Sequence, residues 1–323
     1  MGTFLVRRLL WAVFLFFAAT VVTYVIFFAV PAFDPSANAG GAAATPLHAK
    51  QLREFLKLDE PVWKHYLEFV WNLVAHGSLG QSWYYRVDVN YIIGQRAPVT
   101  ASLVLGSAII WLAVSIPIGV LSALKPRSLL DRASMVFVLV GISAHPIWIG
   151  LLLAYLFGFV LDLTPIAGYC NFFGGGAEQC GGPVQWAYHL LLPWATFTLL
   201  FAALYVRLIR ANVMETLNED YVRTARAKGA SSRRVLVHHV LRNSMLPVVT
   251  ILGMDIGLAL GGAIFTETVF NLPGLGQQLL ISYNTLDLPM IVGIVVFSTV
   301  AVIVFNLVVD VAYFFLDPRI RLA

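Results

Sequence analysis

The sequence has little charge and almost no cysteine. Of its 323 residues, 12% are Asp, Glu, Lys or Arg, about half the roughly 25% that soluble domains carry, whereas 59% are hydrophobic. Two cysteines exclude a disulfide-dense scaffold and a four-cysteine metal site. These shortages disfavour soluble enzymes and DNA-binding proteins. They favour a polytopic membrane protein, in which each span takes about 20 apolar residues.

The sequence also lacks the motifs for binding nucleotide phosphates and for binding a metal ion. A phosphate-binding P-loop needs a Gly-Lys pair followed by Ser or Thr, and none of the five lysines follows a glycine. ATP would therefore be bound by another chain, and no cofactor is predicted for this one. The seven histidines include no His-Glu-x-x-His and no clustered ligand set, so no metal site is predicted either.

Long stretches with few or no charges are what the sequence does contain. Each is long enough to cross about 30 Å of hydrocarbon as a helix, and none shows the period-2 alternation of a strand. We therefore predict an all-α polytopic membrane protein. Its six transmembrane helices are expected at residues 9–33, 97–124, 133–161, 179–206, 243–266 and 288–309.

The positions of Lys and Arg predict the orientation. Fifteen of the 21 basic residues fall in segments that are cytoplasmic if the N-terminus lies inside, and the short outer loops 162–182 and 267–287 hold none. The other six lie in the long segment 34–96, which largely escapes the charge rule. Both termini are thus predicted to be cytoplasmic. A cleaved signal peptide ending near 37–39 is the alternative for the first span, but its apolar run of 25 residues exceeds the usual 7–15.

Two outer segments carry local signals. In the first, Pro61 suits a helix start, and an apolar face follows at helical spacing, formed by Val62, Tyr66, Phe69, Val70 and Leu73. We expect a short helix lying on the membrane or on the spans, with contact to a partner protein as the alternative. In the second, Cys170 and Cys180 flank a glycine-rich stretch. A disulfide between them is favoured on an oxidising side, and two unrelated thiols are the alternative.

The loop between spans four and five, residues 211–244, has the pattern of two helices separated by a glycine. The first helix, 220–228, ends at Gly229, and Ser231 suits the start of the second. A basic topology determinant is the simpler interpretation, but it requires only charge. The helix–Gly–helix pattern also predicts a helical hairpin that presents three side chains to the cytosol, those of Tyr221, Val222 and Ala225.

At this loop the sequence resembles the permease subunits of ABC importers, specifically the B-type subunit of the dipeptide, oligopeptide and nickel group. The family motif Glu-Ala-Ala-x3-Gly falls on 223–229, with Leu246-Pro247 downstream. The glutamate is absent and the Leu-Pro is displaced, and both departures resemble the peptide subgroup, whose loop reads DYVRTARAKG and then HxLRNxxLP. Further matches run through the whole chain in order, at 58–61, 77–80, 96–98, 141–148, 267–270, 273–276 and 317–319.

The resemblance implies the type I fold of ABC importer permeases in a bacterial inner membrane. Its parts would be a transmembrane helix at 1–33, an extracytoplasmic insertion with short amphipathic helices at 34–96, a five-helix core at 97–316 and a cytoplasmic tail at 317–323. The chain would form half of the translocation pathway for dipeptides or oligopeptides. A nickel or metallophore importer of the same family is the alternative.

The resemblance also implies partners. These are a second six-helix permease subunit in a heterodimer, two cytoplasmic ATPase subunits or domains that bind ATP and Mg, and an extracytoplasmic solute-binding protein. Lipid surrounds the helices, and no nucleic acid is expected. In such permeases the loop helix docks into a groove on the ATPase, which assigns coupling to Asp220, Tyr221, Arg223, Thr224, Ala225, Lys228 and Gly229. No residue is predicted to be catalytic.

Asp255 is the candidate for the translocation path. It lies inside the fifth predicted span, where an ionisable group is costly and faces the bundle interior or a water-filled cavity. There it would receive the amino group of a peptide. A structural hydrogen bond to a neighbouring helix is the competing interpretation. Prolines in or near the spans would kink their helices and provide hinges, at Pro117, Pro146, Pro193, Pro247 and Pro289.

Two other classes compete with the importer. Gly141-Ile142-Ser143 resembles the Gly-x-Ser of rhomboid-type intramembrane serine proteases. His145 does not face Ser143 if both lie on one helix, so His189 would have to act as the base. A passive channel or an exporter subunit is the third class. It would tolerate disruption of the loop at 220–229 or transport outward.

Overall fold

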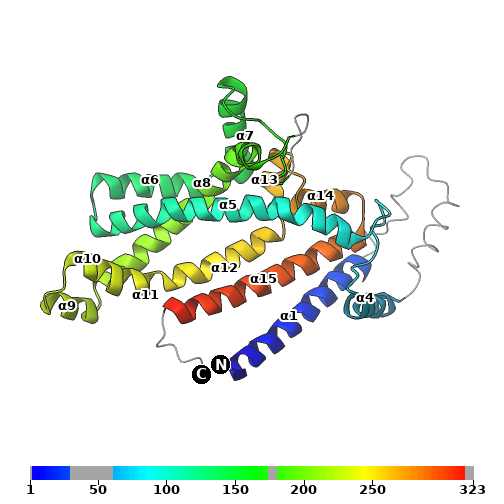
Figure 1. Cartoon of the computed structure of the whole chain (residues 1–323), viewed down its shortest axis with the longest axis horizontal. Helices are drawn as coiled ribbons and strands as arrows, with labels where there is room; N and C mark the ends of the chain where they lie inside the picture. The colour runs from blue at the N-terminus through cyan, green and yellow to red at the C-terminus, as the bar shows by residue number, and fades with distance from the viewer. Residues whose placement is uncertain (1, 30–60, 174–179, 317–323) are drawn as a thin grey trace. The chain divides into compact units, whose positions relative to one another are not determined.

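The structure is a computed structural model (Figure 1) that describes residues 2–29, 61–173 and 180–316. Within these ranges the regular secondary structure is helical, and isolated β-bridges are the only strand-like pairing. Predictions for residues 30–60 and for the tail at 317–323 lie outside the described residues.

The described helices follow one another along the chain as long spans joined by short helices. In order they are α1 (Gly2–Ala29), α4 (Val62–His76), α5 (Val89–Leu124), α6 (Leu129–Ser143), α7 (Pro146–Leu153), the π-helix η3 (Ala154–Val160), α8 (Pro183–Leu217), α9 (Asp220–Ala227), α10 (Ser232–Arg234), the π-helix η4 (Val235–Leu241), α11 (Arg242–Ser244), α12 (Leu246–Leu260), α13 (Ile264–Val269), α14 (Leu275–Asn284) and α15 (Leu288–Leu316).

The chain divides into two compact units, each assembled from segments that are distant in sequence. The first comprises Met1–Thr100, Leu260–Ile264 and Pro273–Ala301. The second comprises Ala101–Ala259, Phe265–Leu272 and Val302–Ala323.

Three helices are long and apolar enough to cross a membrane, namely α5, α8 and the Leu288–Val309 part of α15. Two further pairs meet the same test together but are bent, α6 with α7–η3 by 107° and α10–α11 with α12 by 44°. The described residues therefore hold up to five spans, and Leu10–Ile26 within α1 is a shorter apolar helix. A multi-pass helical membrane protein follows from these lengths, while the count of six spans and their orientation stay predictions.

The third predicted span, 133–161, is broken rather than continuous. α6 ends at Ser143, and His145 caps α7 by accepting a hydrogen bond on Nδ1 from the Ile147 N–H at 3.3 Å. Pro146 at the first position of α7 explains the break, because proline disfavours helical backbone in the residue before it. A kink is predicted at Pro146, and the structure shows a bend of 107° between α6 and the α7–η3 segment.

Other helices continue beyond the predicted spans. α5 begins at Val89 rather than at residue 97, and α8 runs to Leu217 rather than ending at 206. Charged residues set the predicted limits, and they mark where hydrocarbon ends. A helix that leaves the bilayer needs no apolar surface to keep its backbone hydrogen bonds. Helices α5 and α8 therefore extend beyond the charged residues that limit the predicted spans.

In the first unit, α4 packs against α1 as the apolar face after Pro61 predicts. The Tyr24 ring on α1 lies 5.4 Å from Tyr66 and 5.2 Å from Phe69 on α4, measured between ring centroids. A hydrogen bond of 3.1 Å joins the hydroxyls of Thr20 and Tyr66. The helix at this position is confirmed, and it packs against α1 of the same chain.

Residues 267–287, predicted to form an outer loop, contain the short helix α14, which is not among the helices predicted from the sequence. Its first N–H, on Leu275, donates to the Thr100 hydroxyl at 2.8 Å. Gly276 lets α14 approach the chain before α13, because a Cβ there would lie 2.7 Å from the Ile264 nitrogen. Close backbone approach, which only glycine permits, therefore positions this helix.

In the second unit, aromatic rings and a glycine contact hold the long helices together. Trp111 on α5 is fully buried and stacks on Phe201 of α8, with ring centroids 4.6 Å apart. Gly141 on α6 faces Ala203 on α8 so closely that a Cβ on the glycine would overlap the alanine side chain. Small residues at such contacts allow membrane helices to pack through dispersion forces.

Candidate functional site

The predicted cytoplasmic loop is a helical hairpin. α9 (Asp220–Ala227) is followed by Gly229 with φ +81°, a left-handed conformation that glycine adopts at little cost. The N–H groups of Gly229 and Ala230 donate to carbonyls in the last turn of α9, at 2.9 and 3.2 Å, in the Schellman pattern that ends helices. Ser231 caps the next helix by accepting from the Arg234 N–H at 3.4 Å. The helix–Gly–helix prediction is confirmed.

Buried and bonded side chains fix α9 along its length. Val222 on α9 and Val235 on η4 have at most 1% of their surface exposed. At the end away from the glycine turn, the Tyr221 hydroxyl accepts a hydrogen bond from Asn243 Nδ2 at 2.7 Å and donates to the His239 carbonyl at 3.4 Å. The hairpin is therefore closed at both ends.

Between α9 and the helices that follow it lies a hollow of about 920 Å³ that we name the basic hollow. One face of α9 lines it, and η4 and α11 line it from the other side. Its residues are Tyr221, Thr224, Ala225, Lys228, Ala230, Arg234, His238, His239, Arg242 and Asn243. Three of these are permanently cationic, and no Asp or Glu is among the described lining residues.

The basic hollow contains four of the seven residues predicted to couple to an ATPase, namely Tyr221, Thr224, Ala225 and Lys228. The other three are elsewhere on the hairpin. Asp220 and Arg223 form an exposed ion pair of 3.6 Å with each other, and Gly229 makes the turn. Their role in coupling stays a prediction.

The second wall of the basic hollow is absent from the predicted site. It is formed by Arg234, His238, His239, Arg242 and Asn243. The signal is present in residues 238–243 of the sequence, because residues four apart on a helix share a face. That spacing places His238 beside Arg242 and His239 beside Asn243, opposite α9.

α8, which leads into α9, is joined to α6 by an ion pair with a buried carboxylate and a partly exposed arginine, and neither residue belongs to the predicted site. Arg210 donates from Nε and Nη2 to the two carboxylate oxygens of Asp131, at 2.6 and 3.0 Å. Ser122 Oγ and the Arg127 N–H donate to the same carboxylate at 2.7 and 2.8 Å. Asp131 is 5% exposed. Two hydrogen bonds from the arginine and two from other donors compensate the cost of burying the carboxylate.

Asp255 on α12 accepts a hydrogen bond of 2.8 Å from the hydroxyl of Tyr205, which is fully buried on α8. This agrees with the interpretation of Asp255 as a structural partner of a neighbouring helix. Because the carboxyl group is only partly buried, it also retains an exposed side. Its role in the translocation path stays a prediction.

The structure joins Cys170 and Cys180, with Cα atoms 5.1 Å apart. Disulfides need a Cα separation of about 4.4–6.8 Å. His189 lies beside them, its Nδ1 3.2 Å from the Cys170 sulfur and 3.0 Å from the Gln185 carbonyl oxygen. Together the three side chains form a possible ligand group for a metal, but only with both sulfurs reduced.

The residues of the protease alternative are engaged elsewhere. His145 caps α7 and packs edge-on against Phe265, with ring centroids 5.0 Å apart. His189 contacts the Cys170 sulfur and the Gln185 carbonyl. Neither imidazole is hydrogen-bonded to Ser143 in the described part of the chain, so no Ser–His pair is assembled.

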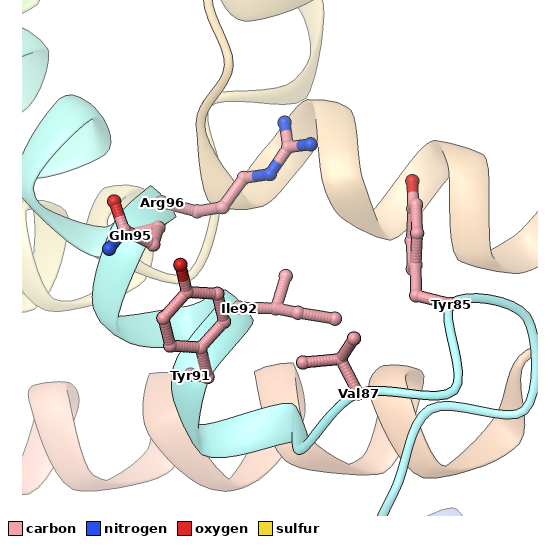
Figure 2. Close-up of a pocket in the computed structure, with 6 residues that line it drawn as sticks. All are labelled: Tyr85, Val87, Tyr91, Ile92, Gln95 and Arg96. Atoms are coloured by element: carbon pink, nitrogen blue, oxygen red, sulfur yellow. The ribbon is translucent and has the colours of Figure 1, made fainter.

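A second, smaller hollow of about 250 Å³ lies in the first unit (Figure 2). Figure 2 shows Arg96 extending above Ile92, with Tyr91 on the same helix and Tyr85 on the preceding segment. That segment is held by Asp287, which accepts hydrogen bonds from Ser82 Oγ and from two backbone N–H groups. The volume of this second hollow is below the roughly 300 Å³ at which pockets begin to hold small-molecule ligands. The basic hollow is therefore the larger candidate site of the two.

Comparison with known proteins places the whole chain in one family. Residues 115–322 match the binding-protein-dependent transport system inner membrane component, and residues 1–104 match the N-terminal region of such membrane components. The dipeptide transport system permease protein DppB of Escherichia coli K12 is 35% identical over 98% of both chains. The di/tripeptide transport system permease protein DppB of Pseudomonas aeruginosa is 34% identical over 99% of both. This chain belongs to the family of inner-membrane components of binding-protein-dependent transport systems.

Proposed function

We propose that this chain forms half of the translocation pathway of an ATP-driven peptide importer. The observation that carries the proposal is the similarity over 98% of the chain to a permease named for dipeptide transport, together with a second relative named for di- and tripeptides. Six spans with both termini in the cytoplasm complete the proposal. They rest on the distribution of Lys and Arg in the sequence.

The proposed partners follow from what this chain provides. No lysine follows a glycine, so ATP and Mg would be bound by two ATPase subunits in the cytoplasm. A family of binding-protein-dependent transporters implies a solute-binding protein that delivers the cargo. A second six-helix permease would supply the other half of the pathway, because one such chain encloses only part of it.

In the proposed mechanism the loop hairpin receives the movement of the ATPase and α8 transmits it. The glycine turn and the Tyr221 hydrogen bonds keep the hairpin rigid, so a push on α9 moves the end of α8. From α8 the Asp131–Arg210 pair reaches α6, and the Tyr205–Asp255 hydrogen bond reaches α12. The bends in the α6–α7 and α11–α12 pairs are where the helices would change direction.

The test is uptake by the reconstituted complex. The chain would be produced with its neighbouring transport subunits, purified through a tag on this chain and placed in proteoliposomes with the binding protein. We expect accumulation of a labelled dipeptide that requires ATP on the ATPase side and stops when ATP is replaced by a non-hydrolysable analogue.

Three results would refute the proposal. Complexes that never contain an ATPase would remove the energy source. Equal dipeptide uptake with and without ATP would indicate a channel. Accumulation of labelled nickel or a nickel chelate instead of dipeptide would assign the chain to the alternative substrate.

A further inference from the structure

Three side chains of the kinds that bind metal ions meet in the second unit, those of Cys170, Cys180 and His189. Their two sulfurs and a ring nitrogen of the histidine lie within 4.8 Å of one another. The Cys170 side chain is fully buried, whereas Cys180 is exposed. Thiolates, rather than disulfide sulfurs, are metal ligands. After reduction of the bond between them, the cluster therefore offers two thiolates and one imidazole, which is a known ligand set for zinc.

The hydrogen bond of the imidazole leaves one ring nitrogen for a metal. Nδ1 of His189 lies 3.0 Å from the Gln185 carbonyl oxygen. Two lone pairs at this distance would repel each other, so Nδ1 carries the proton and donates it, and the lone pair is on Nε2. A backbone carbonyl in this position orients metal-binding histidines and fixes their tautomer. Nδ1 lies 3.2 Å from the Cys170 sulfur, closer than Nε2, but its proton excludes it as a ligand.

The distances from Nε2 to the two sulfurs fit a tetrahedral zinc ion. Zinc binds sulfur at about 2.3 Å and nitrogen at about 2.0–2.1 Å, so a sulfur and a nitrogen on the same tetrahedral ion lie about 3.5 Å apart. Nε2 is 3.6 Å from the Cys170 sulfur and 3.9 Å from the Cys180 sulfur. Both distances are close to the required separation. Only the two sulfurs, once released from each other, have to move apart.

Contacts other than the disulfide also hold the ligands together. The residues that flank the cysteines, Asn171 and Gly181, form an isolated β-bridge. The Phe172 ring packs edge-on against Trp186 of α8, with ring centroids 5.0 Å apart, and His189 lies about one turn further along this helix. Reduction therefore leaves the three ligands gathered. Such preorganisation lowers the entropy cost of binding an ion.

We propose that Cys170, Cys180 and His189 form a redox-dependent zinc site, which binds Zn²⁺ when the disulfide is reduced. A dithiol supplies the reduction. It transfers two electrons to the S–S bond and one proton to each sulfur, and it becomes a cyclic disulfide itself. Zn²⁺ then displaces the two thiol protons to water and bonds to both thiolates and to the Nε2 lone pair. Water takes the fourth position, on the side where Cys180 is exposed.

Charge and ligand softness select the ion. Two thiolates and one Zn²⁺ carry no net charge, so the buried Cys170 sulfur is not left as an isolated anion, which is costly away from water. Mg²⁺ and Ca²⁺ prefer oxygen ligands, whereas thiolates and imidazole suit zinc. The disulfide and the ion use the same sulfurs and exclude each other. This site is independent of the proposed transport function.

The test uses Co²⁺ as a spectroscopic probe of the zinc site in the full-length chain, purified in detergent and reduced with a phosphine. Thiolate-bound Co²⁺ absorbs in the near ultraviolet, and tetrahedral Co²⁺ absorbs strongly in the visible. We expect the reduced wild type to bind one Co²⁺ per chain with both signatures, and Zn²⁺ but not Mg²⁺ to displace it. The oxidised wild type, which is the same folded protein, should show neither signature.

Two histidine variants separate a metal site from a pair of neighbouring thiols. Loss of an outer partner of a metal ligand typically costs about 10–100-fold in affinity, and loss of the ligand itself costs at least as much. We therefore expect His189→Ala to raise the Kd for Co²⁺ by about 100-fold or more. His76→Ala is the matched control and should bind like the wild type, because His76 is an exposed residue at the end of α4, outside the cluster.

Gel filtration of each variant shows whether it is folded, and a second measurement needs no variant. Zn²⁺ should slow the reaction of a maleimide with the reduced wild type several-fold, and a chelator should restore it. Reduced wild type that lacks the thiolate absorption and is not protected by Zn²⁺ would overturn the inference. Equal Co²⁺ affinity in folded His189→Ala and in the wild type, or equal binding before and after reduction, would overturn it as well.

Discussion

Three carboxylates hold together segments that are far apart in the sequence, and only one of them was identifiable from sequence. Asp255 is identifiable because it is the one charged residue in an apolar stretch. Asp131 and Asp287 lie near the ends of spans, where charge is ordinary. Their partners, Arg210 for Asp131 and Ser82 for Asp287, are 79 and 205 residues away along the chain. Such pairs depend on how helices pack, which no local spacing reveals.

The Asp131–Arg210 pair yields a prediction for stability. Arg210→Met would leave Asp131 buried without its cation, which typically costs about 3–5 kcal/mol. We expect a clear fall in the unfolding temperature of the detergent-solubilised protein, measured by a thermal shift assay. Arg207→Met is the matched control on the same helix, because Arg207 is exposed. A variant at 210 that unfolds at the same temperature as the control would show that the pair does not stabilise the fold.

Transport measurements distinguish the two interpretations of Asp255, as a residue of the translocation path or as a structural partner of a neighbouring helix. Asp255→Asn keeps an oxygen that accepts the Tyr205 hydrogen bond, so we expect the fold to persist. The variant loses the negative charge that would receive a peptide amino group. A hydrogen bond to a charged group contributes about 1.5–3 kcal/mol, so uptake of a free dipeptide should fall roughly tenfold or more relative to wild type. Uptake of the N-acetylated dipeptide should not change.

For each dipeptide, uptake by the variant is divided by uptake by the wild type. This ratio does not depend on which dipeptide the binding protein prefers. Equal ratios for the two dipeptides would reject the role in the path and leave Asp255 as a structural residue.

At the scale of elements, the sequence predicts where apolar helices lie better than where helices begin, end or break. Charges delimit the hydrocarbon, so the sequence predicts a span that begins at residue 97, whereas α5 begins at Val89. The sequence does not indicate α14, because its ten residues lie in a loop of mixed polarity and are positioned by Gly276 and Thr100. The sequence does predict the α9 hairpin, because helix capping and termination depend on neighbouring residues. It does not predict the second wall of the basic hollow, because that wall depends on which faces of two helices meet.

The turn at Gly229 gives a prediction on coupling. Its φ of +81° suits glycine, and a non-glycine residue there pays roughly 1–2 kcal/mol for left-handed backbone. A Cβ at this position meets no atom within 4 Å, so the strain comes from the backbone alone. We expect Gly229→Val to displace α9, so that dipeptide uptake falls several-fold while ATP hydrolysis by the complex continues. The measurement is the ratio of ATP hydrolysed to dipeptide imported.

Gly229→Asn is the control for this experiment. Asparagine tolerates the left-handed conformation better than β-branched residues, so coupling should be largely retained. Loss of coupling in both variants to the same extent would mean that the side chain at 229 blocks a partner, and normal coupling in Gly229→Val would refute a role for the turn.

At the scale of the whole molecule, orientation in the membrane decides whether these sites can do what is proposed. The hairpin must face the ATPase in the cytoplasm, and Cys170 and Cys180 must face the oxidising side. Because the chain has only these two cysteines, thiol labelling of the wild type tests the second requirement directly. In intact spheroplasts a membrane-impermeant maleimide should not label the wild type, and it should label both cysteines after treatment with an impermeant reductant.

The inner face is tested with one added thiol. Thr224 is exposed on α9, so the maleimide should react with Thr224→Cys in inverted vesicles and not in spheroplasts. Labelling of the wild type without reductant would show free thiols in place of the bond. Labelling of Thr224→Cys from outside would contradict the predicted topology, and with it the proposal that the hairpin receives the movement of an ATPase, because the hairpin would then face the compartment that holds no ATP.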